Sequence, residues 1–138
     1  MRTDINYSVF PIFLRYLINA AQNKRLVPYH ELENIFGFSH NMVGIYAGAL
    51  GDFCLDQGYP LLNTLIVSAS NPKPASVYNL WLEERGLGED YSAPFECFKF
   101  FHLTSSREKQ VKNFSGMTKL AREWMDEQAN YLIAKKIS

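Results

Sequence analysis

The residue types that most often bind metals or act as nucleophiles are scarce in this chain. Its 138 residues include three histidines and two cysteines. A zinc site needs three or four such ligands brought together, and nucleophilic catalysis needs a nucleophile, a base and an oxyanion site. The spacing of these residues fits neither requirement, so we expect no catalytic residue, no metal and no cofactor. The five residues are His30, His40, His102, Cys54 and Cys97.

Packing explains the two cysteines better than chemistry does. Cys54 falls on the apolar stripe of a predicted helix, and Cys97 stands among phenylalanines. Free cysteine is among the most buried residue types, and two cysteines are too few for a disulfide framework. We therefore expect two buried thiols.

Hydrophobic periodicity predicts a mainly helical chain with one clear strand. Prolines and other turn residues predict a loop over 70–74, and residues 24–28 fit a short strand or a linker. The aromatic run over 95–103 fits either a helix or a strand. The predicted helices span 9–22, 29–36, 40–57, 76–85 and 117–136, and the predicted strand spans 61–68.

Polar and small residues mark the ends and the packing of these helices. Ser8 and Ser39 are expected N-caps, and glycines at 37 and 58 are expected to end the second and third helices. Ser105 with Glu108 fits a capping box before the last helix. The helix over 40–57 also carries Gly44, Ala47, Gly48, Ala49 and Gly51. Glycine weakens a helix by about 1 kcal/mol, so these residues predict the close approach of another backbone.

The order of these elements predicts the fold class. Helix, extended segment, short helix, turn, long helix, strand and loop follow one another as in a winged-helix unit, where the third helix is the recognition helix and the strand starts the wing. We expect one α+β domain over 1–138, mainly helical. A winged-helix-like core would occupy about 9–75, and a helical and aromatic C-terminal extension about 76–138.

Part of this core carries a family resemblance. Residues 26–32, Gly37, residues 42–44 (Met-Val-Gly) and residues 58–62 (Gly-Tyr-Pro-Leu-Leu) together resemble the DNA-binding half of the alkylguanine-DNA alkyltransferases. Asn41 stands where that family has its base-displacing arginine, and residues 63–66 occupy the place of its reactive-cysteine segment. The resemblance therefore implies a fold and not alkyl transfer.

A second resemblance covers about 75 residues, from Tyr29 to Leu103. It consists of Tyr-x-Glu-Leu, a glycine, a helix that ends in a cysteine, Gly-x-Pro-Leu-Leu-x-x-Leu-Ile-Val, a proline-containing loop, a helix and an aromatic run. This pattern is similar to a poorly characterised bacterial and phage domain that sometimes stands beside HNH nuclease modules. The nuclease motif itself is missing here. The resemblance implies an accessory or regulatory role in a prophage or other mobile element.

Charge is unevenly distributed although the net charge is zero. Residues 1–28 carry four bases and one acid, residues 29–102 carry three bases and nine acids, and residues 103–138 carry seven bases and four acids. The predicted recognition helix contains two aspartates and no lysine or arginine. Because phosphate contacts supply most non-specific affinity for DNA, we expect DNA binding to be weak. The candidate DNA contacts are Lys24, Arg25, His40, Asn41 and Lys73.

Three function classes follow in order of preference: a protein-binding module, a winged-helix DNA-binding regulator and a small enzyme. The first accounts for a recognition-helix pattern without DNA-reading charge. Its partner is expected to be another protein or a second copy, with the acidic middle of one molecule meeting the basic tail of another. An aromatic anchor with an acidic rim is the expected contact site, because aromatic residues are enriched in interface hot spots. Its residues are Tyr78, Trp81, Glu83 and Glu84.

The sequence also suggests where the protein resides. No run of about 18 apolar residues is present, so we expect no membrane span. The first residues lack the uninterrupted apolar segment of a signal peptide. We therefore expect a cytoplasmic protein.

Overall fold

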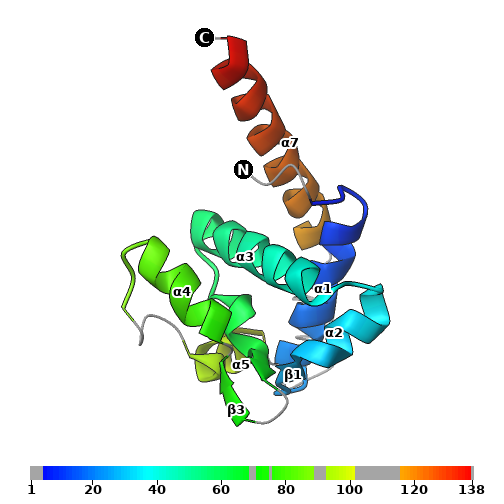
Figure 1. The fold of residues 1–138 in the computed structure, drawn as a ribbon, viewed down its shortest axis with the longest axis vertical. Helices are drawn as coiled ribbons and strands as arrows, with labels where there is room; N and C mark the ends of the chain where they lie inside the picture. Colours follow the sequence, from blue (N-terminus) through cyan, green and yellow to red (C-terminus); the bar gives the residue numbers. More distant parts are fainter. Residues whose placement is uncertain (1–4, 69–70, 75, 89–92, 102–115, 138) are drawn as a thin grey trace.

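A computed structural model describes residues 5–68, 71–74, 76–88, 93–101 and 116–137 of the chain (Figure 1). The predicted capping box at Ser105 and Glu108 lies outside these residues, as does His102. The elements are α1 (Val9–Gln22), β1 (Val27–Pro28), α2 (Tyr29–Phe36), α3 (His40–Gln57), the 3₁₀ helix η1 (Leu62–Leu65), β2 (Ile66–Ser68), β3 (Asn71–Pro74), α4 (Ser76–Glu84), α5 (Pro94–Phe101) and α7 (Gly116–Ile137).

This order confirms a mainly helical α+β chain. The predicted bounds of the first three helices coincide with α1, α2 and α3. The fourth predicted helix is one residue longer than α4 at its end, and the last is one residue shorter than α7 at each end. The aromatic run that fitted either state forms α5. Short aromatic runs are ambiguous because a buried helix and a buried strand need the same residues.

Two predictions in the middle of the chain were wrong. Only the last three residues of the strand expected over 61–68 form β2, because the preceding residues 62–65 form η1. Residues Leu61–Val67 are all buried, and in such a run no alternation separates a strand from a 3₁₀ turn. The loop expected over 70–74 contains β3. This strand lies at the edge of the sheet, the place where prolines are tolerated.

The sheet is small and of mixed direction. Its strands lie in the order β1-β2-β3. Val27 of β1 pairs with Ile66 of β2 in parallel, and Ser68 of β2 pairs with Asn71 of β3 in the antiparallel direction. The parallel pair brings the end of α1 beside the segment that follows α3.

The helix ends follow the expected capping chemistry at three of four places. The Ser39 hydroxyl accepts a hydrogen bond from the backbone N–H of Met42 at 3.2 Å, and Gly37 and Gly58 have φ of 67° and 75°. Ser8 makes no side-chain cap. The Asn6 side chain takes that role, because its Oδ1 accepts from the backbone N–H of Ser8 at 2.8 Å and of Val9 at 3.2 Å.

Helix α3 lies at the centre of the molecule. Six consecutive residues, Tyr46 to Gly51, are buried. Successive residues of a helix turn by about 100°, so this stretch is enclosed on every side. Figure 1 shows α3 crossing the body between α1 and α4. Its small residues allow this enclosure: a Cβ at Gly51 would stand 2.4 Å from Asn63 Nδ2 and 2.5 Å from Trp81 Cζ2.

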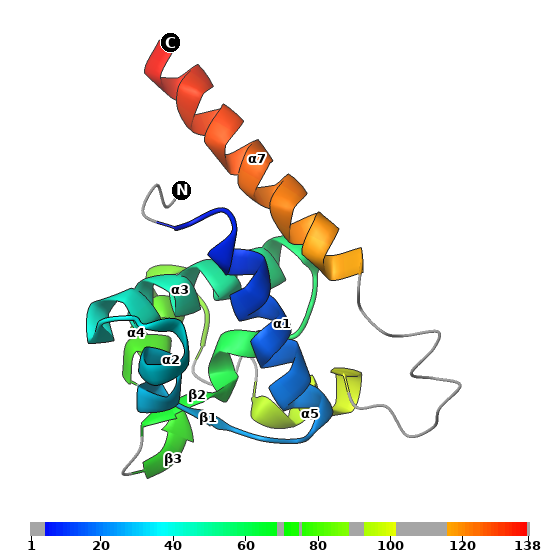
Figure 2. The same ribbon diagram turned by 90° about the vertical axis from the view of Figure 1, so that its right-hand side faces the viewer.

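Among the described side chains of α7, those that pack on the body lie in its first half. Its buried residues Met117, Ala121, Trp124 and Met125 face the core. The ring of Trp124 lies 5.6 Å from that of Phe10, and its indole N–H donates to Asp56 Oδ2 at 2.8 Å. Beyond Met125 the helix runs away from the other described elements, as Figure 2 shows from the side.

The contact at Gly51 yields the first prediction. Gly51→Ala should lower the free energy of unfolding by about 1 to 3 kcal/mol, because the new methyl group overlaps Asn63 and Trp81. Urea unfolding measures this change. Gly88→Ala is the matched control, since nothing lies within 4 Å of a Cβ there. Equal stabilities of the two variants would contradict the close contact.

Candidate functional site

The structure corrects the expected aromatic anchor on α4. The side chains of Tyr78 and Trp81 are each 4% exposed and belong to the core of the chain. They therefore do not form an exposed anchor. Glu83 and Glu84 are exposed, as expected of a rim.

Trp81 is buried at the contact between α4 and α3, where its ring lies against Gly51. Its ring stacks on that of Tyr78, also on α4, with centroids 6.2 Å apart. The guanidinium of Arg85, the residue after α4, lies 4.5 Å from the centroid of the Trp81 ring. Arg85 Nη2 donates to Asp52 Oδ2 of α3 at 2.9 Å. The spacing of Tyr78, Trp81 and Leu82 at i, i+3 and i+4 was the sequence signal for this buried face.

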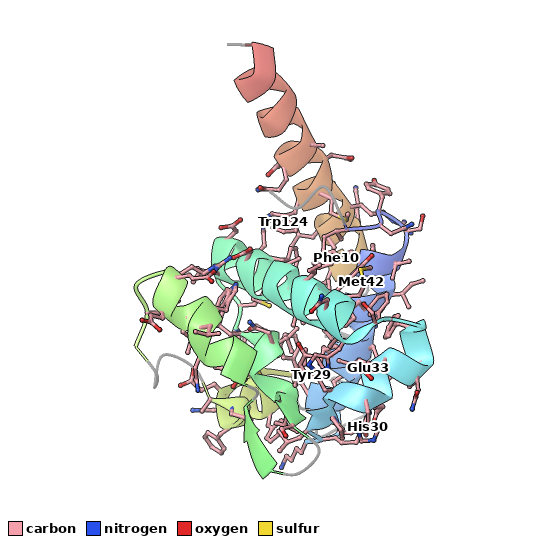
Figure 3. The ribbon with its side chains drawn as sticks, viewed as in Figure 1. Phe10, Tyr29, His30, Glu33, Met42 and Trp124 are labelled. Carbon is pink, nitrogen blue, oxygen red and sulfur yellow. The ribbon has the colours of Figure 1, made fainter. Side chains whose placement is uncertain are left out.

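The start of α3 holds two of the candidate DNA contacts, His40 and Asn41. Both are exposed, and the His40 side chain is 76% exposed. His40 Nδ1 lies 2.9 Å from Glu33 Oε1, and its ring lies 4.6 Å from that of Tyr29. Figure 3 shows Tyr29 and Glu33 on α2, near the start of α3. An acidic neighbour at this position opposes phosphate binding.

The basic residues among the candidate DNA contacts differ in their surroundings. Lys24 is exposed in a left-handed backbone conformation, with φ of 53°. Arg25 forms a two-pronged ion pair with Glu31, at 2.9 Å and 2.8 Å, and Tyr16 donates to the same carboxylate. This hydrogen bond from Arg25 holds the pKa of Glu31 below its usual value. The Lys73 side chain lies outside the described residues.

The two thiols lie in the core, as predicted. Cys54 and Cys97 are 0% exposed. Cys97 Sγ donates to the carbonyl of Leu61 at 3.4 Å. Burial raises the pKa of Cys54 to about 12 and raises that of Cys97 as well. Both groups are therefore neutral thiols at physiological pH.

The described part of the chain was expected to contain neither a metal site nor a membrane-spanning helix. No group of three or more His, Cys, Asp or Glu there could hold a metal ion. None of the helices within it combines the length and the apolar composition that a membrane crossing requires.

The projecting segment of α7, residues 126–137, lies outside the interface residues predicted from the sequence, although it belongs to the basic tail that was expected to meet an acidic surface of a second copy. Asp126, Glu127 and Ala129 are exposed, and a hydrogen bond of 3.4 Å from the Tyr7 hydroxyl reaches Asp126. The sequence continues with Tyr131, Leu132 and Ile133 in this segment. Its helical pattern was visible, but the point at which the body stops covering it depends on the positions of α1 and α3. Figure 3 marks that point by Phe10 and Trp124, where α1 meets α7.

The Arg25–Glu31 pair yields a pH prediction. A carboxylate whose pKa is lowered on folding stabilises the fold above its unfolded pKa, and this stabilisation is lost as the pH falls through the folded pKa. Glu31→Gln should therefore lower the free energy of unfolding at neutral pH by up to about 1 kcal/mol. Urea unfolding should show the gap to wild type closing as the pH falls below the usual value of 4.5. Glu83→Gln, at an exposed position, is the control. A gap that does not depend on pH would contradict the ion pair.

The thiols give a second prediction for this region. A charged thiol reagent such as DTNB should label neither Cys54 nor Cys97 in the native protein, because both are buried and protonated. Both should be labelled in denaturant, and absorbance of the released thiolate counts them. Rapid labelling of one thiol in the native protein would contradict the packing around η1.

Comparisons with protein-family models, with curated proteins and with solved structures found no match for this chain.

Proposed function

We propose that this chain is a non-enzymatic protein-binding module that contacts its partner through the projecting segment of α7. One observation carries the proposal. Among the residues of α7 whose side chains are described, which end at Ala129, the last buried one is Met125, whereas the helix continues to Ile137. In both ribbon views the intervening turns run away from the other described elements (Figures 1 and 2).

Helix energetics give this observation its meaning. Isolated helices shorter than about 12 to 15 residues are marginal in water, and most helices are stabilised by packing of an apolar face. Within the described structure, the projecting segment is held by the continuity of α7 and by the hydrogen bond from the Tyr7 hydroxyl to Asp126 at its start. Three consecutive large apolar or aromatic residues, Tyr131 to Ile133, stand in its middle. A partner that covers them would supply the missing packing.

A second copy of this chain is the partner that the charge order favours. The segment begins with Asp126 and Glu127 and ends with Lys135 and Lys136. Two copies in antiparallel order place the acids of one beside the bases of the other, and the apolar residues in the middle of both. Parallel copies would bring like charges together, which destabilises paired helices. We therefore propose an antiparallel helix pair.

Sedimentation equilibrium over a wide concentration range tests this pairing. The wild-type chain should associate reversibly. Leu132→Asp should weaken association at least about thirtyfold, the loss that follows from removing a central apolar contact. Leu80→Asp is the matched control, because Leu80 is a 57% exposed leucine of α4. A wild-type chain that stays monomeric at every concentration would overturn the second copy as partner.

Charge variants test the direction of the pair. Lys135→Glu with Lys136→Glu makes both ends of the segment acidic, and Asp126→Lys with Glu127→Lys makes both ends basic. Each double variant alone should be monomeric, and the two should associate when mixed. The quadruple variant, with acids and bases exchanged, should regain self-association only if the pair is antiparallel.

A winged-helix DNA-binding regulator is the second candidate. The antiparallel pair of β2 and β3 follows α3 at the place of a wing, and His40 and Asn41 are exposed at the start of α3. These features support a winged-helix-like core. The acidic surroundings predict weak binding to duplex DNA that is lost near physiological ionic strength. A footprint at one defined sequence, abolished by Asn41→Ala, would favour the regulator over the protein-binding module.

The proposed cellular role follows the resemblance to the bacterial and phage domain. A module that pairs through one helix and leaves the body free suits an accessory or regulatory protein of a mobile element. Its proposed location is the cytoplasm.

A further inference from the structure

A small hollow lies between α3, η1 and α4. It measures about 10 Å³ and is lined by Gly48 of α3, Asn63 of η1, and Tyr78 and Trp81 of α4, with Tyr29 at its edge. A cavity needs about 10 to 15 Å³ of this kind to hold one water molecule. The hollow therefore has room for about one water molecule.

Two polar atoms of the lining residues lack a protein partner. Asn63 Oδ1 and Trp81 Nε1 are buried and form no hydrogen bond with the protein. Asn63 is 3% exposed and Trp81 is 4% exposed, so bulk water does not satisfy these atoms. Leaving such a group unpaired costs about 1 to 3 kcal/mol. Thr64 Oγ1 is unpaired too, but Thr64 does not line the hollow.

Gly51 shows that the two side chains are neighbours. The point where its Cβ would stand is 2.4 Å from Asn63 Nδ2 and 2.8 Å from Trp81 Cε2, the ring carbon bonded to Nε1. The Asn63 amide and the polar edge of the indole therefore approach the same place on α3. One of them offers an acceptor and the other a donor.

We propose that this hollow is a binding site for one neutral molecule of water size, water itself being the ligand. Its oxygen accepts a hydrogen bond from the Trp81 indole N–H, and one of its hydrogens is donated to Asn63 Oδ1. A cation is disfavoured because the indole offers a donor, and an anion because the Asn63 oxygen offers an acceptor. The bound water joins η1 to α4 where both cross α3. It thus serves as a fixed part of the fold and not as a substrate.

Nuclear magnetic resonance of the full chain tests the site, with the second tryptophan as an internal control. Rotating-frame spectra should show a dipolar cross peak between the Trp81 indole proton and a long-lived water, with the sign that separates it from chemical exchange. The Trp124 indole proton should show none, because it is donated directly to Asp56. Trp81→Phe removes one indole signal and so assigns the pair.

A second variant identifies the acceptor. Asn63→Leu should abolish the cross peak at Trp81 and leave the Trp124 signal in place. A cross peak that survives in this variant would overturn the assignment of Asn63. In the wild-type protein, a Trp81 indole proton without a water cross peak would overturn the site itself. The wild-type measurement decides the question even if Asn63→Leu does not fold.

Discussion

The close approach of η1 and α4 to α3 at Gly51 is the constraint on which the rest of the fold depends. No larger residue fits between Asn63 and Trp81 at their present positions. This contact encloses Trp81, and Arg85 then reaches Asp52 of α3. It also places η1, so that the following strand β2 pairs with β1 beside the end of α1. A glycine in a central helix costs helix propensity, and here the packing of two further elements offsets that cost.

This arrangement divides the molecule into two parts with different physical character. The body encloses α3 on every side over six residues, so its interior is fixed by shape. The second half of α7 lies outside that enclosure, with acids at its start and bases at its end. A helix that presents itself in this way is suited to recognising another helix, where charge order selects direction and apolar residues supply the area.

The sequence predicted what depends on local pattern and missed what depends on distant neighbours. The bounds of α1 and α3 follow from apolar spacing and from Ser39 and Gly58, all of them local signals. The burial of Trp81 could not be decided from its own helix, because nine residues show a stripe without saying what covers it. Gly51 held the missing information, thirty positions earlier, since only the fold brings the two together. Likewise Asn63 stood out as a polar residue in an apolar run, but its role depends on the indole beside it.

The packing of α1 against α7 has a consequence for the order in which the chain is made. Phe10 precedes its neighbour Trp124 by 114 positions in the chain, so Phe10 leaves the ribosome well before Trp124 does. Until α7 emerges, the part of the α1 surface that Trp124 covers stays exposed on the nascent chain. Such surfaces are where partly folded chains associate wrongly and where chaperones bind. Docking of the first half of α7 is therefore the step that covers this part of α1.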